Sequence, residues 1–202
     1  MSGWSLHNGQ AMALPAENID TDQLIPARFM STPRAVGYGG FLLFDQRHDD
    51  AGKAHPDHPL NRLRPTVLVV GRNFGSGSSR EAAVYALVDF GVRVVLAPSF
   101  GDIFSGNAIN NGLLPARLAA DDHARLLEAV DAGLAAISID LTTLQVRCGT
   151  LHLPFTLDPV WQQKLINGWD DIDLTRAHGD EIAEFVKVRA DRHPWMLPGV
   201  GV

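Results

Sequence analysis

The most regular pattern of apolar residues lies between residues 66 and 97. Residues 66–70 form a β-branched run that ends at Gly71, which predicts a strand buried on both faces. Residues 78–90 carry apolar side chains at helical spacing, and Gly91 follows where a helix commonly ends. Residues 92–97 form a second apolar run. The order strand, loop, helix, strand predicts a βαβ unit with parallel strands and a right-handed crossover.

Weaker patterns continue on both sides of this unit. Downstream they predict a short helix over residues 103–111, a surface helix over 121–132, short strands over 136–155 broken at Gly149, and helices over 159–166 and 180–192. Upstream, residues 15–63 are dense in proline and glycine, which favours loops and short elements. A long irregular stretch of this kind is usually functional. The predicted fold class is α/β, with a mixed β-sheet flanked by helices.

The length of the chain suits one domain, because single domains commonly hold ~100–200 residues. We expect residues 1–202 to form a single domain, with residues 1–65 as its loop-rich N-terminal part and residues 66–202 as its α/β core and C-terminal helices. Apolar residues make up 46% of the chain and charged residues 20%, which are ordinary proportions for a soluble globular protein with one core.

The charge balance excludes some classes of partner. A formal net charge of -6 and a pI near 5.7 leave no basic patch dense enough to follow a phosphate backbone, so we expect no nucleic acid partner. No apolar run reaches the ~18 residues needed to span a bilayer, and no basic segment leads into an apolar stretch near residue 1. The sequence therefore predicts a cytoplasmic protein without membrane association.

Cysteine and histidine usage bears on metal binding. Cys148 is the only cysteine, so this chain alone cannot build a disulfide or a multi-thiolate zinc or iron-sulfur site, and we expect it to be a buried small apolar residue. Any such cluster must belong to a partner. His48, His55 and His58 lie in a polar, proline-bearing stretch without rigid helical spacing, which favours a solvated loop over a metal site.

The loop over residues 71–81 carries the candidate chemistry. It reads Gly-Arg-Asn-Phe-Gly-Ser-Gly-Ser-Ser-Arg-Glu and lies between the predicted strand and helix, where α/β proteins place ligands. Free backbone N–H groups at a helix N-terminus favour anions, and Arg80 adds a guanidinium suited to a carboxylate or phosphate.

Two other interpretations of this loop remain open at the level of local pattern. Ser78 and Glu81 satisfy the spacing of a helix capping box, so Ser78 is also a candidate helix cap. Nucleotide binding is disfavoured, because the Gly-Lys-Ser/Thr of a phosphate loop is absent and Arg80 stands where the dinucleotide fingerprint needs glycine.

At this loop the chain resembles a known family. Residues 73–81 are similar to the signature of aconitase-superfamily swivel domains. Residues 18–28, which contain Asp-Thr-Asp, and residues 97–107 resemble two further segments of that family. Residues 167–175 are similar to the C-terminal region of bacterial isopropylmalate dehydratase small subunits. The resemblance runs in order from about residue 11 to about residue 195, so it covers nearly the whole chain.

The resemblance implies a hydro-lyase that works only with a second, large subunit. The reaction isomerises 2-isopropylmalate to 3-isopropylmalate by dehydration and rehydration through isopropylmaleate, in leucine biosynthesis. It implies that Ser78 removes the proton as an alkoxide, that Ser79 and Arg80 hold a substrate carboxylate, and that Arg34, in the mobile loop over residues 30–40, is a second substrate contact. The large subunit would supply a [4Fe-4S] cluster as Lewis acid, while this chain would bind no cofactor and no metal.

Departures from the family pattern keep alternatives open. The family usually has histidine where this chain has Ala82, and often cysteine where it has Ser76. One alternative is the small subunit of a related hydratase acting on homoaconitate, citraconate or dimethylmaleate. Another is a non-catalytic module that keeps the anion site. Arg34 could equally be a solvated loop residue, and an alternative for Arg28 is pairing with Asp20 or Asp22.

Overall fold

A mixed sheet forms the centre of the protein. The computed structural model describes residues 2–196, and within them seven strands pair in the order β4-β3-β2-β1-β5-β6-β7. The strands are β1 (Leu6–Leu14), β2 (Val67–Val70), β3 (Val94–Ala97), β4 (Leu114–Arg117), β5 (Ala136–Asp140), β6 (Gln145–Cys148) and β7 (Leu151–Pro154). The α/β fold class and the mixed sheet predicted from the sequence are confirmed.

Strand β1 joins the two halves of this sheet. Its C-terminal part pairs in parallel with β2, from Ala11 opposite Val67 to Leu14 opposite Val70. Its N-terminal part pairs antiparallel with β5. Strands β2, β3 and β4 continue the parallel half, and β6 and β7 continue the antiparallel half. The carboxyl ends of four parallel strands therefore meet at one edge.

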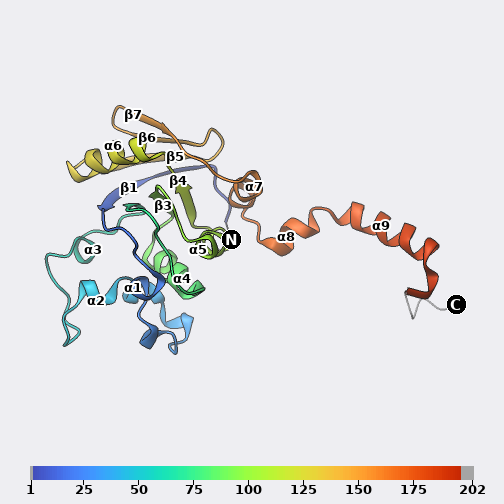
Figure 1. Ribbon diagram of the computed structural model, residues 1–202, viewed down its shortest axis with the longest axis horizontal. Helices are drawn as coiled ribbons and strands as arrows, with labels where there is room; N and C mark the ends of the chain where they lie inside the picture. The colour runs from blue at the N-terminus through green and yellow to red at the C-terminus, as the bar shows by residue number, and fades with distance from the viewer. Residues whose placement is uncertain (1, 197–202) are drawn as a thin grey trace.

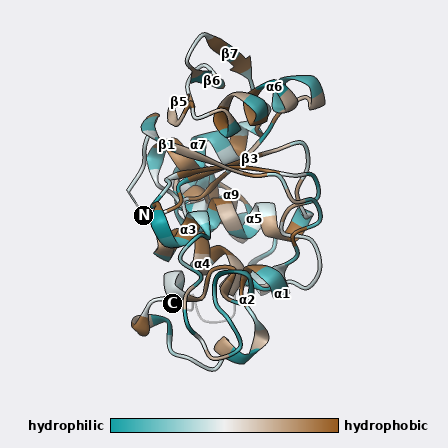
Figure 2. Cartoon of the chain, turned by 90° about the vertical axis from the view of Figure 1, so that its left-hand side faces the viewer, coloured by the Kyte–Doolittle hydropathy of each residue, from teal (hydrophilic) through white to brown (hydrophobic). Residues whose placement is uncertain are grey.

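Helices cover both faces of the sheet because side chains along each strand alternate between two apolar cores. Leu68 and Val70 of β2 lie in a core with α4 (Glu81–Phe90) and part of α5 (Asp102–Asn110). Val67 and Val69 lie in the other core, with α6 (Ala120–Asp131) and α7 (Pro159–Asn167). Figure 2 shows the hydrophobic strands between α6 on one side and α4 and α5 on the other.

The proline- and glycine-rich segment forms short helices that pack near α4. They are α1 (Thr21–Leu24), η1 (Ala27–Phe29), η2 (Arg34–Val36), η3 (Tyr38–Phe41), α2 (Phe44–Arg47) and α3 (Pro59–Arg62). Leu24, Ile25, Leu42 and Leu43 of this segment are fully buried in the α4 core. The segment is irregular in backbone, as predicted, yet it contributes apolar side chains to the core.

The C-terminal helices leave the body of the molecule. Beyond α7, α8 (Asp171–Arg176), α9 (Gly179–Arg192) and η4 (Pro194–Met196) run outward in sequence (Figure 1). Among residues 2–196, no helix combines the length and apolar character required to cross a bilayer.

The sequence predicted the βαβ unit correctly, and the structure corrects the residues at which its elements begin. Strands β2 and β3 are parallel neighbours connected through α4, as expected. Helix α4 begins at Glu81 rather than residue 78, and β3 begins at Val94 rather than residue 92. Strand β1 was missed, because its polar first half lacks the β-branched run that marks β2. Strand β4 and helix α8 were also not predicted.

The packing of α4 gives a test of the fold. Leu87→Ala removes a fully buried side chain from the core around α4, so we expect the free energy of unfolding to fall by about 2–5 kcal/mol. Leu63→Ala, at an exposed position, is the control and should change it by less than ~0.5 kcal/mol. Denaturant unfolding measures both, and equal losses in the two variants would contradict the assigned core.

Candidate active site at the carboxyl end of the parallel strands

The candidate loop, residues 71–80, connects β2 to α4 at the edge where the parallel strands end. Its backbone is left-handed at Asn73 (φ 58°), Gly75 (φ 70°) and Gly77 (φ 93°). Gly75 is required for a second reason, because a Cβ there would lie 2.3 Å from a ring carbon of Phe104. The glycines let the loop pass close to α5 before it enters the helix.

On one side, the loop is bonded to the connection that follows β3. The Phe74 N–H donates to the Ser99 carbonyl at 3.2 Å, and the Gly101 N–H donates to the Phe74 carbonyl at 2.9 Å. The Phe74 side chain is buried, with its ring edge-on to Phe100 and Phe104 at centroid distances of 6.4 and 5.5 Å. Two of the segments in the family resemblance therefore form one packed unit.

On its other side, the loop is bonded to the segment around α1. The Gly75 N–H donates to the Ile19 carbonyl at 2.7 Å, and the Thr21 N–H donates to the Ser76 carbonyl at 2.9 Å. The Thr21 hydroxyl donates to the Ser78 carbonyl at 3.0 Å, and Thr21 is only 2% exposed. Thr21 was not singled out from the sequence, because a threonine between two aspartates gives no local signal of burial.

Ser78 does not cap α4, so that interpretation of the sequence is wrong. The N-cap position is Arg80, whose N–H donates to the Ser78 carbonyl at 2.8 Å, and no side chain caps this helix. Glu81 accepts a hydrogen bond from the Asn111 side chain at 2.8 Å instead of completing a capping box. The left-handed Gly77 turns the chain before helical geometry begins. Ser78 is consequently exposed, beside a helix N-terminus.

Arg80 is held beside the two serines by an ion pair. Its guanidinium donates to the carboxylate of Asp22, and the Arg80 side chain is 20% exposed. A guanidinium has five N–H donors, so this contact leaves donors for an anion. Ser79 is exposed next to it. The structure thus brings Ser78, Ser79 and Arg80 together at the start of α4.

Arg34 lies elsewhere along α4. Its guanidinium carbon stands 3.6 Å from the centroid of the Tyr85 ring, and its Nη2 is 3.5 Å from Asp89 Oδ1. Both partners lie a turn or more beyond the start of the helix. Partial burial, and then the neighbouring Glu81, raise the pKa of Tyr85. In this conformation Arg34 is tied to the flank of α4 rather than joined to Ser78.

The alternative pairing of Arg28 is also corrected. Arg28 forms its ion pair with Asp45, and its guanidinium carbon stands 4.7 Å from the centroid of the Phe29 ring. The carboxylate of Asp22 is taken by Arg80, and that of Asp20 accepts the Gln23 N–H at the start of α1.

The two departures from the family pattern have different surroundings. Ala82 packs in the apolar core around α4, so this position contributes no polar group to the site. Ser76 is half-buried and joins the segment around α1 through its backbone carbonyl.

The histidines in the stretch over residues 48–58 make local contacts. The His48 ring stacks on Phe44 with centroids 3.9 Å apart, and His58 Nδ1 accepts the Leu60 N–H at 3.2 Å at the start of α3. Burial, followed by nearby positive groups, lowers the pKa of His58. Within residues 2–196, no three histidine, cysteine, aspartate or glutamate side chains gather closely enough to hold a metal ion. Cys148 is buried in the second core, as predicted, and burial raises the pKa of its thiol.

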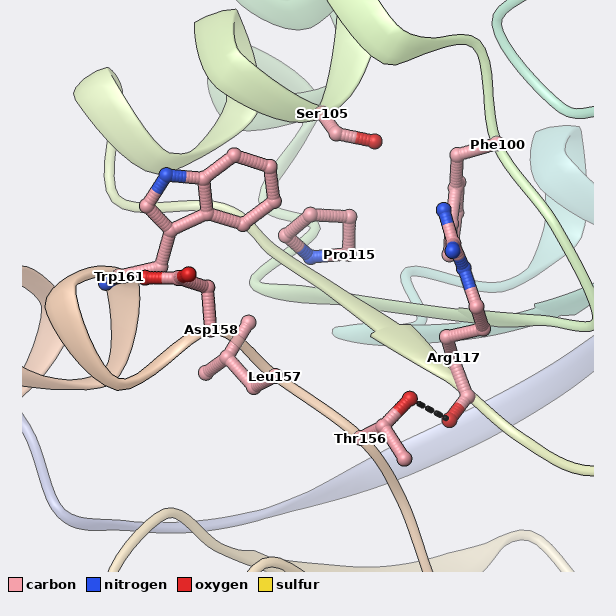
Figure 3. A pocket seen from close by; sticks show the side chains of 8 residues that line it. All are labelled: Phe100, Ser105, Pro115, Arg117, Thr156, Leu157, Asp158 and Trp161. Atoms are coloured by element: carbon pink, nitrogen blue, oxygen red, sulfur yellow. Dashed lines mark hydrogen bonds between the residues drawn. The ribbon is translucent and has the colours of Figure 1, made fainter.

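A separate cavity of about 220 Å³ is lined by Phe100, Ser105, Arg117 and Trp161, among others (Figure 3). Its polar groups are largely engaged. The Ser105 hydroxyl donates to the Gly101 carbonyl, Asp158 accepts the first N–H groups of α7, and the Thr156 hydroxyl donates to the Arg117 carbonyl. Neither Ser78 nor Arg80 lines this cavity, so it is distinct from the candidate site.

Comparison with known proteins identifies the class of protein to which this architecture and this loop belong. The family model for the aconitase C-terminal domain matches residues 1–121. The chain is 45% identical to the 3-isopropylmalate dehydratase small subunit of Shewanella sp. (strain ANA-3), with 92% of this chain and 96% of that one covered. It is 39% identical to that of Rhodospirillum centenum, with 98% and 100% covered. The chain therefore belongs to the family of 3-isopropylmalate dehydratase small subunits.

A solved structure supports the fold assignment. The 3-isopropylmalate dehydratase (leuD) of Methanocaldococcus jannaschii superposes with a TM-score of 0.64 at 24% identity, covering 89% of this chain and 98% of that chain. At this identity the likeness shows the fold.

The contact made by Thr21 gives a test of loop anchoring. Thr21→Val removes the donor to the Ser78 carbonyl, a loss of ~0.5–1.5 kcal/mol that should speed local opening about 2- to 12-fold. Amide hydrogen exchange at Gly75, whose N–H is bonded to Ile19, measures the effect. Thr21→Ser keeps the hydroxyl and should exchange as the wild type does. Equal exchange in the valine variant would contradict an anchoring role for the hydroxyl.

Proposed function

We propose that this chain is the small subunit of a two-subunit 3-isopropylmalate dehydratase, which converts 2-isopropylmalate to 3-isopropylmalate through isopropylmaleate in leucine biosynthesis. The observation that carries the proposal is the Ser78-Ser79-Arg80 group at the start of α4, with both serines exposed, in a chain that aligns with its small-subunit relatives over nearly its full length. A cytoplasmic location, predicted from the sequence, belongs to the same proposal.

In the proposed reaction, Ser78 takes a proton from a carbon of the substrate. That carbon lies beside a carboxylate, so the proton is weakly acidic and the base must be an alkoxide when it acts. The start of α4 supplies partial positive charge, and Arg80 supplies a full one, which both stabilise such an anion. Loss of the proton and of the hydroxyl group on the neighbouring carbon forms the double bond, and water then adds in the opposite sense.

Ser79 and Arg80 are proposed to hold a substrate carboxylate. The Asp22 carboxylate orients the Arg80 side chain, so the guanidinium meets the substrate with little loss of side-chain freedom. Arg34 remains a proposed contact for the substrate's side group. Its ion pair with Asp89 is long and partly exposed, and pairs of this kind contribute ~0–1 kcal/mol, so it can rearrange.

The iron-sulfur cluster implied by the family does not fit the donors of this chain. A cluster needs several thiolates, and the one cysteine, Cys148, is buried in the core away from the loop. We propose that a [4Fe-4S] cluster lies on the large subunit. The exposure of Ser78 and Ser79 supports a site that is closed by this partner, because electrostatic stabilisation is strongest where water is excluded.

The reconstituted pair tests the proposed function. We expect this chain alone to contain no stoichiometric iron or sulfide and to have no hydratase activity, and we expect the pair with its large subunit to isomerise 2-isopropylmalate. The departures from the family pattern at Ala82 and Ser76 left related hydratases as alternatives. Measuring kcat/KM on 2-isopropylmalate, homoaconitate, citraconate and dimethylmaleate distinguishes among them. Higher kcat/KM on one of the others would replace the substrate proposed here.

Substitution of Ser78 tests the base. Ser78→Ala should lower kcat by about 10²–10⁴-fold while the pair still assembles, because a positioned proton acceptor is lost and Ser79 and Arg80 remain. Ser5→Ala, an exposed serine on the segment before β1, is the matched control and should leave kcat unchanged. Activity of Ser78→Ala within a few-fold of wild type would assign the proton to another group.

Substitution of Arg80 tests the carboxylate contact separately. Arg80→Lys keeps the charge but loses the fork of N–H donors, so we expect KM to rise at least about 10-fold with a smaller effect on kcat. Steady-state kinetics of the pair resolve the two constants. An unchanged KM would show that the substrate carboxylate binds elsewhere.

A further inference from the structure

The C-terminal arm, defined here as residues 171–196, lies apart from the rest of the protein. It comprises α8, α9 and η4 and extends outward from α7 (Figure 1). Neither α8 nor α9 has a buried residue in the part of the chain that the structure describes. An isolated helix of 14 residues is marginal in water, so α9 needs a surface to pack against.

Helix α9 has one apolar face. Ile182, Phe185 and Val186 follow the i, i+3, i+4 spacing and are 43%, 62% and 48% exposed. Glu184 and Lys187 fall on the opposite face at the same spacing rule. An amphipathic helix whose apolar side meets water is typical of a segment that binds a groove in a partner.

The base of the arm is fixed to the body by an ion pair between the buried Lys164 and the exposed Asp171. The Lys164 ammonium is buried, and it donates to Asp171 Oδ1 at 2.6 Å and to the Asn110 side chain. Asp171 in turn accepts from Asn110 Nδ2 at 3.1 Å, and the Lys164 contact lowers the pKa of the Asp171 carboxyl. Because Asn110 ends α5, the arm is attached to the helix whose first turn backs the candidate loop.

The buried area argues against a second copy of this chain as the occupant. Two α9 helices paired face to face would cover three large apolar side chains each. That amounts to roughly a few hundred Å², well below the ~1,200 Å² at which stable interfaces begin. A contact of this size suffices where it adds to a larger interface. The candidate site, with its exposed serines, is proposed above to form such an interface with the large subunit.

We propose that the apolar face of α9 docks in an apolar groove of the large subunit and supplies affinity for the pair without taking part in the chemistry. The inference rests on the proposed function, since the large subunit is the partner that the proposal names. The arm then acts as a tether whose anchored base keeps the catalytic loop near the subunit boundary.

A paired set of variants tests the docking face. Ile182→Gln with Phe185→Gln makes the face polar while keeping good helix formers, and should raise the Kd for the large subunit at least tenfold, with kcat at saturating small subunit unchanged. Glu184→Gln with Lys187→Gln, on the opposite face, leaves the net charge unaltered and should leave Kd within twofold. Titration of the large subunit with each small-subunit variant gives Kd, and light scattering gives the mass of the free chain.

The outcomes separate this inference from the proposed function. An active wild-type pair whose Kd is unaffected by the face variant overturns the docking proposal alone. A pair that is inactive on 2-isopropylmalate but loses affinity in the face variant overturns the proposed substrate and supports docking. A free chain that is dimeric, and becomes monomeric in the face variant while Kd for the large subunit holds, assigns α9 to a second copy and overturns the proposal.

Discussion

The packing of Phe74 edge-on against the stacked rings of Phe100 and Phe104 is the contact on which the site depends. A loop with left-handed residues at 73, 75 and 77 has no regular hydrogen-bond ladder of its own. Burying Phe74 against Phe100 and Phe104 fixes one point of that loop to the core. Backbone bonds then hold it from both sides, to the connection after β3 and to the segment around α1. The exposed serines can therefore stand at a defined position without packing of their own.

Electrostatics at the start of α4 follow from the same arrangement. Two sources of positive character, the N-terminus of α4 and the Arg80 guanidinium, lie beside Ser78, and the carboxylates of Asp22 and of the first-turn residue Glu81 oppose them. An exposed pair such as Arg80 with Asp22 contributes little in water, but its strength rises when a partner excludes solvent. The isolated domain thus holds the groups in place, and a covering surface would give them their full effect.

The candidate loop and the elements on either side of it could be predicted from the sequence, whereas long-range pairings could not. Strands β2 and β3 can be recognised in the sequence as short apolar runs, because they are buried on both faces. The start of α4 was misplaced by three residues, because the capping-box spacing is satisfied while the Glu81 side chain is engaged by Asn111 from another helix. Similarly, the pairing of Arg28 with Asp45 and the burial of Thr21 depend on how the proline-rich segment folds back.

For α9, the sequence predicted the helix itself but not the surroundings of its apolar face. Its spacing predicted a helix over residues 180–192, and the structure places one at Gly179–Arg192. Periodicity identifies an apolar face but does not identify the surface that covers it. Figure 1 shows that α9 lies away from the sheet, so the body of the protein does not cover this face. The protein therefore leaves two surfaces uncovered. They are the exposed serines at the start of α4 and the apolar face of α9. The loop that carries the serines packs on Phe104 in the first turn of α5, and Asp171, at the base of the arm, is bonded to Asn110 at the other end of the same helix, so α5 links the loop to the base of the arm.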